Sequence, residues 1–124
     1  MLRIISANLN GIRSAVKKGF MPWAIAQKAD FICIQELKAQ RDDLEDAILN
    51  PDGMRGFFHH AEKKGYSGCG IYTPHKPDEV LYGYGNQEFD MEGRYVEVRF
   101  KKLSVISVYM PSGSSSPERQ EIGR

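Results

Sequence analysis

The sequence predicts an α/β (α+β) protein built mainly from a mixed β-sheet assembly with few helices. A strand, a helix and a second strand open the chain over residues 2–36, an order typical of a βαβ unit with parallel strands. From residue 55 onward the pattern changes to apolar runs separated by short segments rich in turn-forming residues. This spacing is typical of antiparallel hairpins.

Two apolar runs, at residues 2–7 and 31–36, indicate the first strands. The second run begins with four apolar residues in succession, as in a strand buried on both faces. It ends at Glu36, and the first run leads into Asn8 and Asn10. Because ligands bind at the carboxyl ends of strands in α/β sheets, we expect these oxygen-bearing side chains to lie together. An acid after a strand is also commonplace at a surface, so Glu36 alone does not establish a site.

Two helices are predicted before residue 55. The first should begin near Pro22, because proline suits the first helical turn, and run to residue 28. Residues 13–18 could open an earlier helix, but Gly19 and Pro22 interrupt that segment. The second helix should occupy residues 42–49, where apolar residues recur at helical spacing and two aspartates suit the positive end of the helix dipole.

Five further strands are predicted in the rest of the chain. Their ranges are 55–61, 68–73, 80–84, 94–100 and 103–109. Alternation is clearest where Val96, Val98 and Phe100 interleave with polar or charged residues. Residues 116–118, with serine, proline and glutamate, carry the signals that open a helix, but no apolar stripe follows them. We therefore expect the sequence to be part of a longer domain.

Composition narrows the class of protein. With 124 residues, 41% hydrophobic and 27% charged, the chain suits a single globular domain, and no apolar run is long enough to cross a membrane. A formal charge of +1 excludes a protein held to nucleic acid by bulk positive charge, so any phosphate contact must be local. Cys33 and Cys69 lie in apolar surroundings and are expected to be buried thiols. The N-terminus lacks signal-peptide features, so we expect a cytoplasmic protein.

Five segments carry a family resemblance, in the same order as in the family. They are residues 4–13 (IISANLNGIR), 34–38 (IQELK), 65–72 (GYSGCGIY), 92–94 (EGR) and 107–113 (SVYMPSG). Together they resemble the exonuclease III family of apurinic/apyrimidinic endonucleases, within the endonuclease/exonuclease/phosphatase superfamily. The resemblance implies half of a two-sheet mixed β-sandwich with helices packed outside. Residues 1–124 would then form a single partial domain without its C-terminal half.

The resemblance also implies a metal-dependent phosphodiesterase site. Attack on a phosphodiester needs a Lewis acid, and Mg²⁺, with Mn²⁺ as an alternative, prefers hard oxygen ligands. Glu36 would be the central metal ligand, with Asn8 in the same cluster and Asn10 beside it, near the substrate. Tyr109 would donate a hydrogen bond to the scissile phosphate, although a strand tyrosine can also simply cap the core. Arg94 would contact substrate phosphate or pair with a carboxylate.

Two features depart from the family pattern. Many relatives have an acidic residue where this chain has Asn10, and the family's chains are about twice as long. The second half would carry an Asp-x-Asn and a Ser-Asp-His motif, which supply the general acid or base. His59, His60 and His75 match neither context, so we expect them to be ordinary surface or strand residues. The chain alone is therefore expected to lack useful nuclease activity.

For the complete protein, the resemblance implies incision of double-stranded DNA 5′ to abasic sites, with 3′-5′ exonuclease activity as an accompanying function. The expected partners are abasic DNA and the C-terminal half, with no membrane. Two alternatives stay open. One is a phosphatase or nonspecific nuclease of the same superfamily, and the other is a non-catalytic fragment that binds DNA or a protein.

Overall fold

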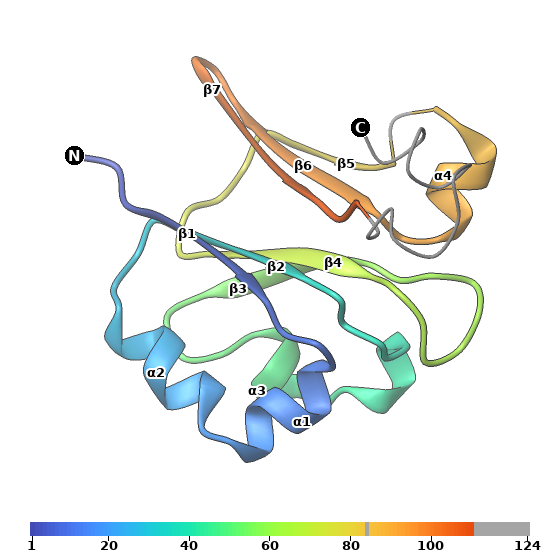
Figure 1. The fold of residues 1–124 in the computed structure, drawn as a ribbon. Helices are drawn as coiled ribbons and strands as arrows, with labels where there is room; N and C mark the ends of the chain where they lie inside the picture. The colour runs from blue at the N-terminus through green and yellow to red at the C-terminus, as the bar shows by residue number, and fades with distance from the viewer. Residues whose placement is uncertain (84, 111–124) are drawn as a thin grey trace.

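Two β-sheets pack face to face, and three helices cover the outer face of one sheet (Figure 1). The computed structural model describes residues 1–83 and 85–110. The strands are β1 (Ile4–Asn8), β2 (Phe31–Gln35), β3 (Arg55–His59), β4 (Cys69–Thr73), β5 (Glu79–Tyr82), β6 (Tyr95–Phe100) and β7 (Leu103–Val108). The helices are α1 (Ile12–Lys17), α2 (Phe20–Ala26), α3 (Asp46–Leu49), α4 (Gln87–Met91) and the 3₁₀ helix η1 (Arg41–Asp43). The fold class predicted from the sequence is confirmed.

The first sheet has the strand order β1-β2-β4-β3 and is mixed. Strands β1 and β2 are parallel, with Ile4 opposite Phe31 and Asn8 opposite Gln35, which confirms the predicted parallel pair. Strand β4 runs antiparallel to both of its neighbours. The carboxyl ends of β1 and β2 therefore lie side by side at one edge of this sheet.

The second sheet is antiparallel, in the order β5-β6-β7. Strands β6 and β7 form a tight hairpin across Lys101 and Lys102. The predicted strand at residues 80–84 corresponds to β5, which begins at Glu79 and ends at Tyr82; residue 84 lies outside the described part of the chain. The predicted helix start at residues 116–118 also lies outside it.

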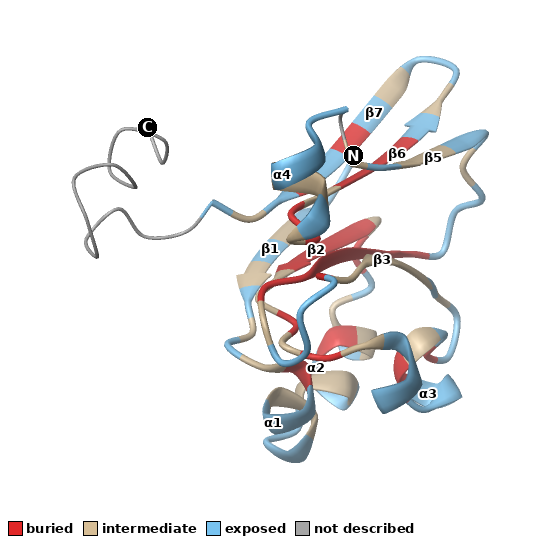
Figure 2. Ribbon diagram, turned by 90° about the vertical axis from the view of Figure 1, so that its right-hand side faces the viewer, coloured by how far each residue is buried: buried red, intermediate tan, exposed pale blue. Residues whose placement is uncertain are grey.

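Two apolar clusters hold these layers together, and β2 contributes to both (Figure 2). Ile32 and Ile34 point toward the helices, whereas Phe31 and Cys33 point toward the second sheet. This alternation follows from the two-residue repeat of a strand, and it explains why the whole run is apolar. Full burial of each large side chain contributes about 1.5–3 kcal/mol, so β2 is a principal source of stability.

Both cysteines lie in the cluster between the sheets and are free. Burial raises the pKa of the Cys33 thiol to about 11 and that of the Cys69 thiol further still. The two thiols stay protonated and behave as small apolar side chains, as predicted.

The helices differ from the predictions in their boundaries. The helix predicted at residues 22–28 begins earlier, at Phe20, because Gly19 adopts a left-handed conformation (φ 95°) that starts a new helix. Gly19 thus separates α2 from α1, and the segment that it was expected to disrupt is helical. The continuous helix predicted at residues 42–49 is wrong. Leu44 is extended (φ −112°, ψ 127°), which divides the segment into η1 and α3.

Helix α4 was not predicted. Its first turn is capped by Asn86, whose side-chain oxygen accepts a hydrogen bond from Phe89 N at 3.0 Å. This is a recognisable N-cap signal, but the five-residue helix is too short to show an apolar stripe. No helix in the described ranges is both long and apolar enough to cross a membrane.

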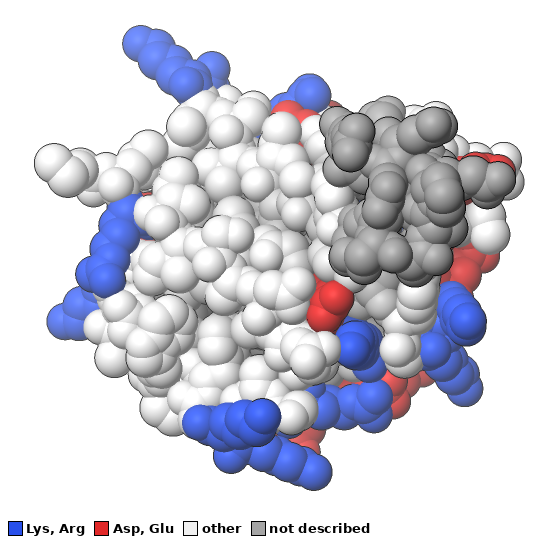
Figure 3. All heavy atoms as spheres, in the orientation of Figure 1, with Lys and Arg blue, Asp and Glu red and all other residues white. Residues whose placement is uncertain are grey.

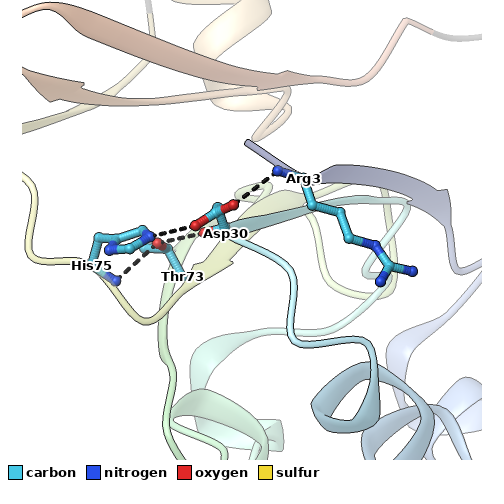
Figure 4. Close-up of polar contacts among 4 residues, drawn as sticks. All are labelled: Arg3, Asp30, Thr73 and His75. Carbon is cyan, nitrogen blue, oxygen red and sulfur yellow. Dashed lines mark hydrogen bonds and ion pairs between the residues drawn. The ribbon is translucent and has the colours of Figure 1, made fainter. Parts of the chain in front are cut away.

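Asp30, directly before β2, joins three segments at the end of the sheet opposite Glu36 (Figure 4). Its carboxylate contacts His75 Nε2 at 2.8 Å and accepts a hydrogen bond from Arg3 N at 2.8 Å. Its carbonyl accepts a hydrogen bond from Thr73 Oγ1 at 2.8 Å. The cluster ties the start of β1 and the end of β4 to the start of β2.

Candidate active site

Glu36 and Tyr109 are 73 positions apart in the chain but in direct contact, because Tyr109 Oη donates to Glu36 Oε1 at 2.6 Å. Glu36 follows β2 in the first sheet, and Tyr109 follows β7 in the second. The Tyr109 backbone is held in turn by a hydrogen bond from its N to Arg94 O at 2.9 Å. The structure therefore brings the predicted metal ligand and the predicted phosphate-contacting phenol together.

The phenol of Tyr109 stays protonated at neutral pH. Partial burial, with smaller contributions from the hydrogen bond and the charge of Glu36, raises the pKa of Tyr109 to about 12. A protonated phenol is a hydrogen-bond donor, whereas a phenolate would repel both a carboxylate and a phosphate. Tyr109 is thus suited to donate to an anion.

The end of β1 brings Asn8 and Asn10 to the same edge. Asn8 is the last residue of β1 and lies opposite Gln35, the residue before Glu36. Asn10 N donates to Asn8 Oδ1 at 3.0 Å, and Asn10 adopts a left-handed conformation (φ 49°) that bends the chain away from the strand. Both predicted asparagines therefore lie beside Glu36 at the end of adjacent parallel strands.

Lys38 holds the Asn10 side chain, a contact that was not predicted. Lys38 Nζ donates to Asn10 Oδ1 at 2.7 Å, and Arg13 Nη2 donates to Lys38 O at 3.1 Å. Since the Asn10 oxygen is occupied by a cation, its amide group is oriented to donate rather than to bind a metal. The sequence did carry a signal, because Lys38 lies two residues after Glu36 in the segment that shows the family resemblance.

The backbone after β2 is unusual. Glu36 and Lys38 both have positive φ angles, 54° and 52°, on either side of Leu37, which is fully buried. Leu37 N donates to Gly68 O at 3.1 Å, and Lys38 N donates to Ser67 O at 2.8 Å. Non-glycine residues in this region cost on the order of 1–3 kcal/mol each and cluster at functional sites. The buried Leu37 anchors a segment that presents Glu36 and Lys38 at the site.

Arg94 is buried, with 5% of its surface exposed. Its guanidinium pairs with Glu92 and lies over the Phe89 ring, 5.5 Å from the ring centre. Of the two roles considered from the sequence, the structure shows the carboxylate pair. A role in substrate binding stays a prediction, and the direct contribution to the site is the carbonyl of Arg94 that receives Tyr109 N.

The three histidines lie in unrelated environments. His59 Nδ1 is 3.0 Å from Tyr95 O, and His60 Nδ1 is 2.8 Å from Ala39 O, while His75 pairs with Asp30 at the opposite end of the sheet. Burial lowers the pKa of His60, which keeps that imidazole neutral. Each imidazole thus has a partner within the protein, and its assignment as an ordinary surface or strand residue stays a prediction.

The donor groups at the site fit Mg²⁺ in kind. Glu36 supplies a carboxylate and Asn8 an amide oxygen, both hard oxygen ligands of the type that Mg²⁺ prefers. Within residues 1–83 and 85–110, no three His, Cys, Asp or Glu side chains gather into a metal-binding group. A single carboxylate offers little charge to offset dehydration of the ion, so we expect weak binding by this chain.

A groove of about 430 Å³ begins at Asn8 and Asn10 and continues across α1 and α2. Lys18 and Trp23 are among the residues that line it, and the Trp23 side chain is 46% exposed. Lys and Arg side chains also gather at the lower margin of the molecule in Figure 3, where Figure 1 shows these helices. A lysine and an exposed aromatic ring in one groove suit a phosphate and a base.

Comparison with known proteins shows the class to which this fold belongs. Residues 5–123 match the Endonuclease/Exonuclease/phosphatase family, and the chain belongs to this family. It is 35% identical over 119 residues to an exodeoxyribonuclease of Bacillus subtilis, and the match covers 95% of this chain and 46% of that protein. It is also 32% identical over 115 residues to the DNA repair nuclease APEX1 of Danio rerio, covering 91% of this chain and 37% of that protein.

Solved structures show the same fold. An AP endonuclease from Archaeoglobus fulgidus superposes with a TM-score of 0.82 at 28% identity, covering 99% of this chain and 47% of that one. The catalytic domain of APE2 from Xenopus laevis has a TM-score of 0.79 at 28% identity, covering 97% of this chain and 49% of that one. The chain therefore spans about half the length of these relatives. The family resemblance inferred from the sequence is confirmed.

Proposed function

We propose that this chain is the N-terminal half of a Mg²⁺-dependent DNA repair nuclease that hydrolyses the backbone 5′ to abasic sites and trims 3′ ends. The observation that carries the proposal is the contact between Tyr109 Oη and Glu36 Oε1, at 2.6 Å. It joins a metal-binding carboxylate to a phosphate-binding donor across two sheets. The similarity to exodeoxyribonucleases and DNA repair nucleases supports DNA as the substrate.

Glu36 and Asn8 would hold the metal ion, which supplies Lewis-acid stabilisation of the attacked phosphate. When substrate binds, the single Tyr109 O–H would turn from Glu36 Oε1 and donate its hydrogen bond to a phosphate oxygen, where negative charge develops. The Asn10 amide group donates to a second phosphate oxygen, while Lys38 fixes its orientation through Asn10 Oδ1. These residues bind and orient the phosphate. None of them is placed to activate the attacking water.

DNA would extend from this site into the groove over α1 and α2. Lys18 there would contact a backbone phosphate, and Trp23 would offer an exposed ring for stacking. Because the net charge of the whole chain is only +1, a local groove of this kind is the physically reasonable route to DNA binding.

The second half of the site would come from the region that the relatives carry beyond the match. In the described part of the chain, β1 and β7 each have one strand neighbour and one open edge. Between them runs a groove of about 350 Å³ with exposed apolar side chains at Ile4, Ile106 and Val108. Open edges and apolar surface suit a polypeptide that adds strands to both sheets.

The test is incision of a fluorogenic duplex with one abasic site, in the presence of Mg²⁺. Three samples are assayed. The first is the chain alone, the second is the chain with the separately expressed C-terminal half of the Bacillus subtilis relative, and the third is the Glu36→Gln variant of the chain with that same half. We expect incision only in the second sample. If the reconstituted mixture does not cleave the abasic duplex but does cleave an inositol phosphate or undamaged DNA, the chain belongs to another branch of the family. A complex that binds DNA without any hydrolysis would support the non-catalytic alternative.

A further inference from the structure

A small polar network joins the two sheets beside their apolar interface. Gln35 Nε2 donates to Ser107 Oγ at 3.3 Å and to Ser6 Oγ at 3.3 Å. Ser107 Oγ donates in turn to Ile34 O at 3.1 Å. The network thus links β1 and β2 of the first sheet to β7 of the second, through the side chains of Gln35 and Ser107, which are 72 positions apart in sequence.

Ser107 is 1% exposed, and its hydroxyl both donates and accepts across the boundary between the sheets. A buried hydroxyl without partners is costly, so this residue favours one placement of β7 over β2. Moving β7 by one residue would turn Ile106 or Val108 into its place, and the Gln35 amide would lose its acceptor on the second sheet and keep only Ser6 Oγ. The network therefore favours one register of the second sheet over the first, in addition to the apolar packing between them.

This register determines where the two site residues lie. Glu36 directly follows Gln35, and Tyr109 lies two residues after Ser107, about 7 Å further along the same side of the chain. Within the described residues, the Tyr109 hydroxyl and the Glu36 carboxylate are hydrogen-bonded to each other and to no other side chain. Their approach thus depends on how the sheets are placed.

We propose that Gln35 and Ser107 are positioning residues, whose hydrogen bond across the sheets holds the Tyr109 phenol against the Glu36 carboxylate. The chemical use of that pair rests on the proposed function. The contact itself is a property of this chain and can be measured without metal or DNA.

The experiment is a double-mutant cycle read by NMR of the chain labelled with ¹³C at the tyrosine Cζ, at neutral pH and without metal. The measured quantity is the change in the Tyr109 resonance caused by Glu36→Gln. We expect this change to be large in the wild type and to fall at least about threefold in Ser107→Ala and in Gln35→Met. Ser107→Thr retains the hydroxyl and should restore the response. Ser6→Ala is the matched control, because it removes the other Gln35 contact without touching the link between the sheets.

A full Tyr109 response in Ser107→Ala and Gln35→Met, accompanied only by a lower melting temperature, would overturn the proposal and leave the network a purely structural one. If Ser107→Ala does not fold, the Tyr109 response measured in Gln35→Met, which removes the partner on the first sheet, tests the proposal instead. A Mg²⁺ titration of the same samples tests the proposed nuclease function separately from the positioning role of Gln35 and Ser107. Absence of binding at Glu36 would contradict the proposed function, whereas the Tyr109 response would still decide the role of Gln35 and Ser107.

Discussion

Lys38 Nζ lies 2.7 Å from Asn10 Oδ1, so a lysine that follows β2 fixes the side chain of an asparagine that follows β1. The amide partner is neutral, so this contact places no carboxylate against the Lys38 ammonium. This relationship leads to the first prediction.

In a complex reconstituted with the C-terminal half of a relative, Lys38→Met should weaken DNA binding about tenfold at low salt. The substitution removes one cation near the phosphate and frees the Asn10 side chain to rotate. The slope of log affinity against log salt concentration should therefore decrease by about 1, as for the loss of one phosphate contact. Binding to a labelled abasic duplex between low and moderate salt measures both quantities.

Lys28→Met is the matched control, because Lys28 is exposed and follows α2 at the opposite end of β2. An equal loss of affinity for the two variants would show that Lys38 contributes only general charge.

Metal binding by the chain should be weak and should depend on Glu36. One carboxylate supplemented by amide oxygens compensates poorly for removing water from Mg²⁺. An NMR titration with Mg²⁺ should therefore shift the amides around Asn8 and Glu36 in the wild type, and Glu36→Gln should abolish these shifts. Glu45→Gln, at an exposed glutamate before α3, serves as the control. Identical shifts in wild type and Glu36→Gln would identify a different ligand.

Tyr109→Phe should lower turnover of the reconstituted complex by about 10²- to 10³-fold, with a much smaller effect on substrate binding. The reason is that the phenol donates most strongly to charge that develops in the transition state. Steady-state kinetics and a thermal melt are measured together, with Tyr82→Phe on β5 as a control. Normal turnover with a reduced melting temperature would mean that Tyr109 only caps the core.

The interaction between Asp30 and His75 should make stability depend on pH in the acid range. The hydrogen bond from His75 lowers the pKa of the Asp30 carboxyl below its ordinary value of 3.8, with a second contribution from Arg3 N. A lowered pKa in the folded state adds stability above the unfolded pKa, and this stability is lost as the pH falls through the folded value. Asp30→Asn should therefore lower the melting temperature above about pH 4, and the difference should disappear at lower pH.

Melting curves between pH 2 and 7 measure this effect, with Asp52→Asn at an exposed turn as the control. A difference between Asp30→Asn and wild type that is constant over the whole pH range would assign the effect to packing rather than to ionisation.

Local sequence patterns were sufficient to predict the sheet elements and the residues at the ends of β1 and β2. The apolar run in β2 and the amide and acid residues after the two strands are short-range signals, and parallel pairing follows from the connecting helices. The contact between Glu36 and Tyr109 is different, because it depends on packing between strands 73 residues apart. Only the family resemblance placed Tyr109 at this site.

The missed features depend on tertiary structure or on single backbone conformations. Ser107 has no local property that distinguishes it from any other serine in a strand, and its role depends on the opposing Gln35. The break between η1 and α3 depends on two extended residues, Leu44 and Glu45, inside a segment of good helical pattern. The buried side chain of Leu44 contributes to the core, so packing outweighs helix propensity there.

The last prediction concerns the open side of the two sheets. Ile106 is 47% exposed and Val108 42% exposed on the edge strand β7, and they face a groove that also includes Ile4 of β1. Exposed apolar residues on an unpaired edge favour association with another polypeptide. We therefore expect the purified chain to self-associate in sedimentation experiments, and to bind the C-terminal half of a relative in preference to itself.

Ile106→Lys should reduce both associations, because a charged side chain on an edge strand opposes strand addition. Met91→Lys, at a comparably exposed apolar residue on helix α4, is the matched control and should leave them unchanged. We also expect the chain alone to show no incision of abasic DNA, because none of the residues that the family resemblance assigns to its site is a general acid or base, groups that are each typically worth about 10²- to 10⁴-fold. Robust Mg²⁺-dependent incision by a monomeric chain would contradict both expectations, and would mean that residues assigned here to structure activate the attacking water.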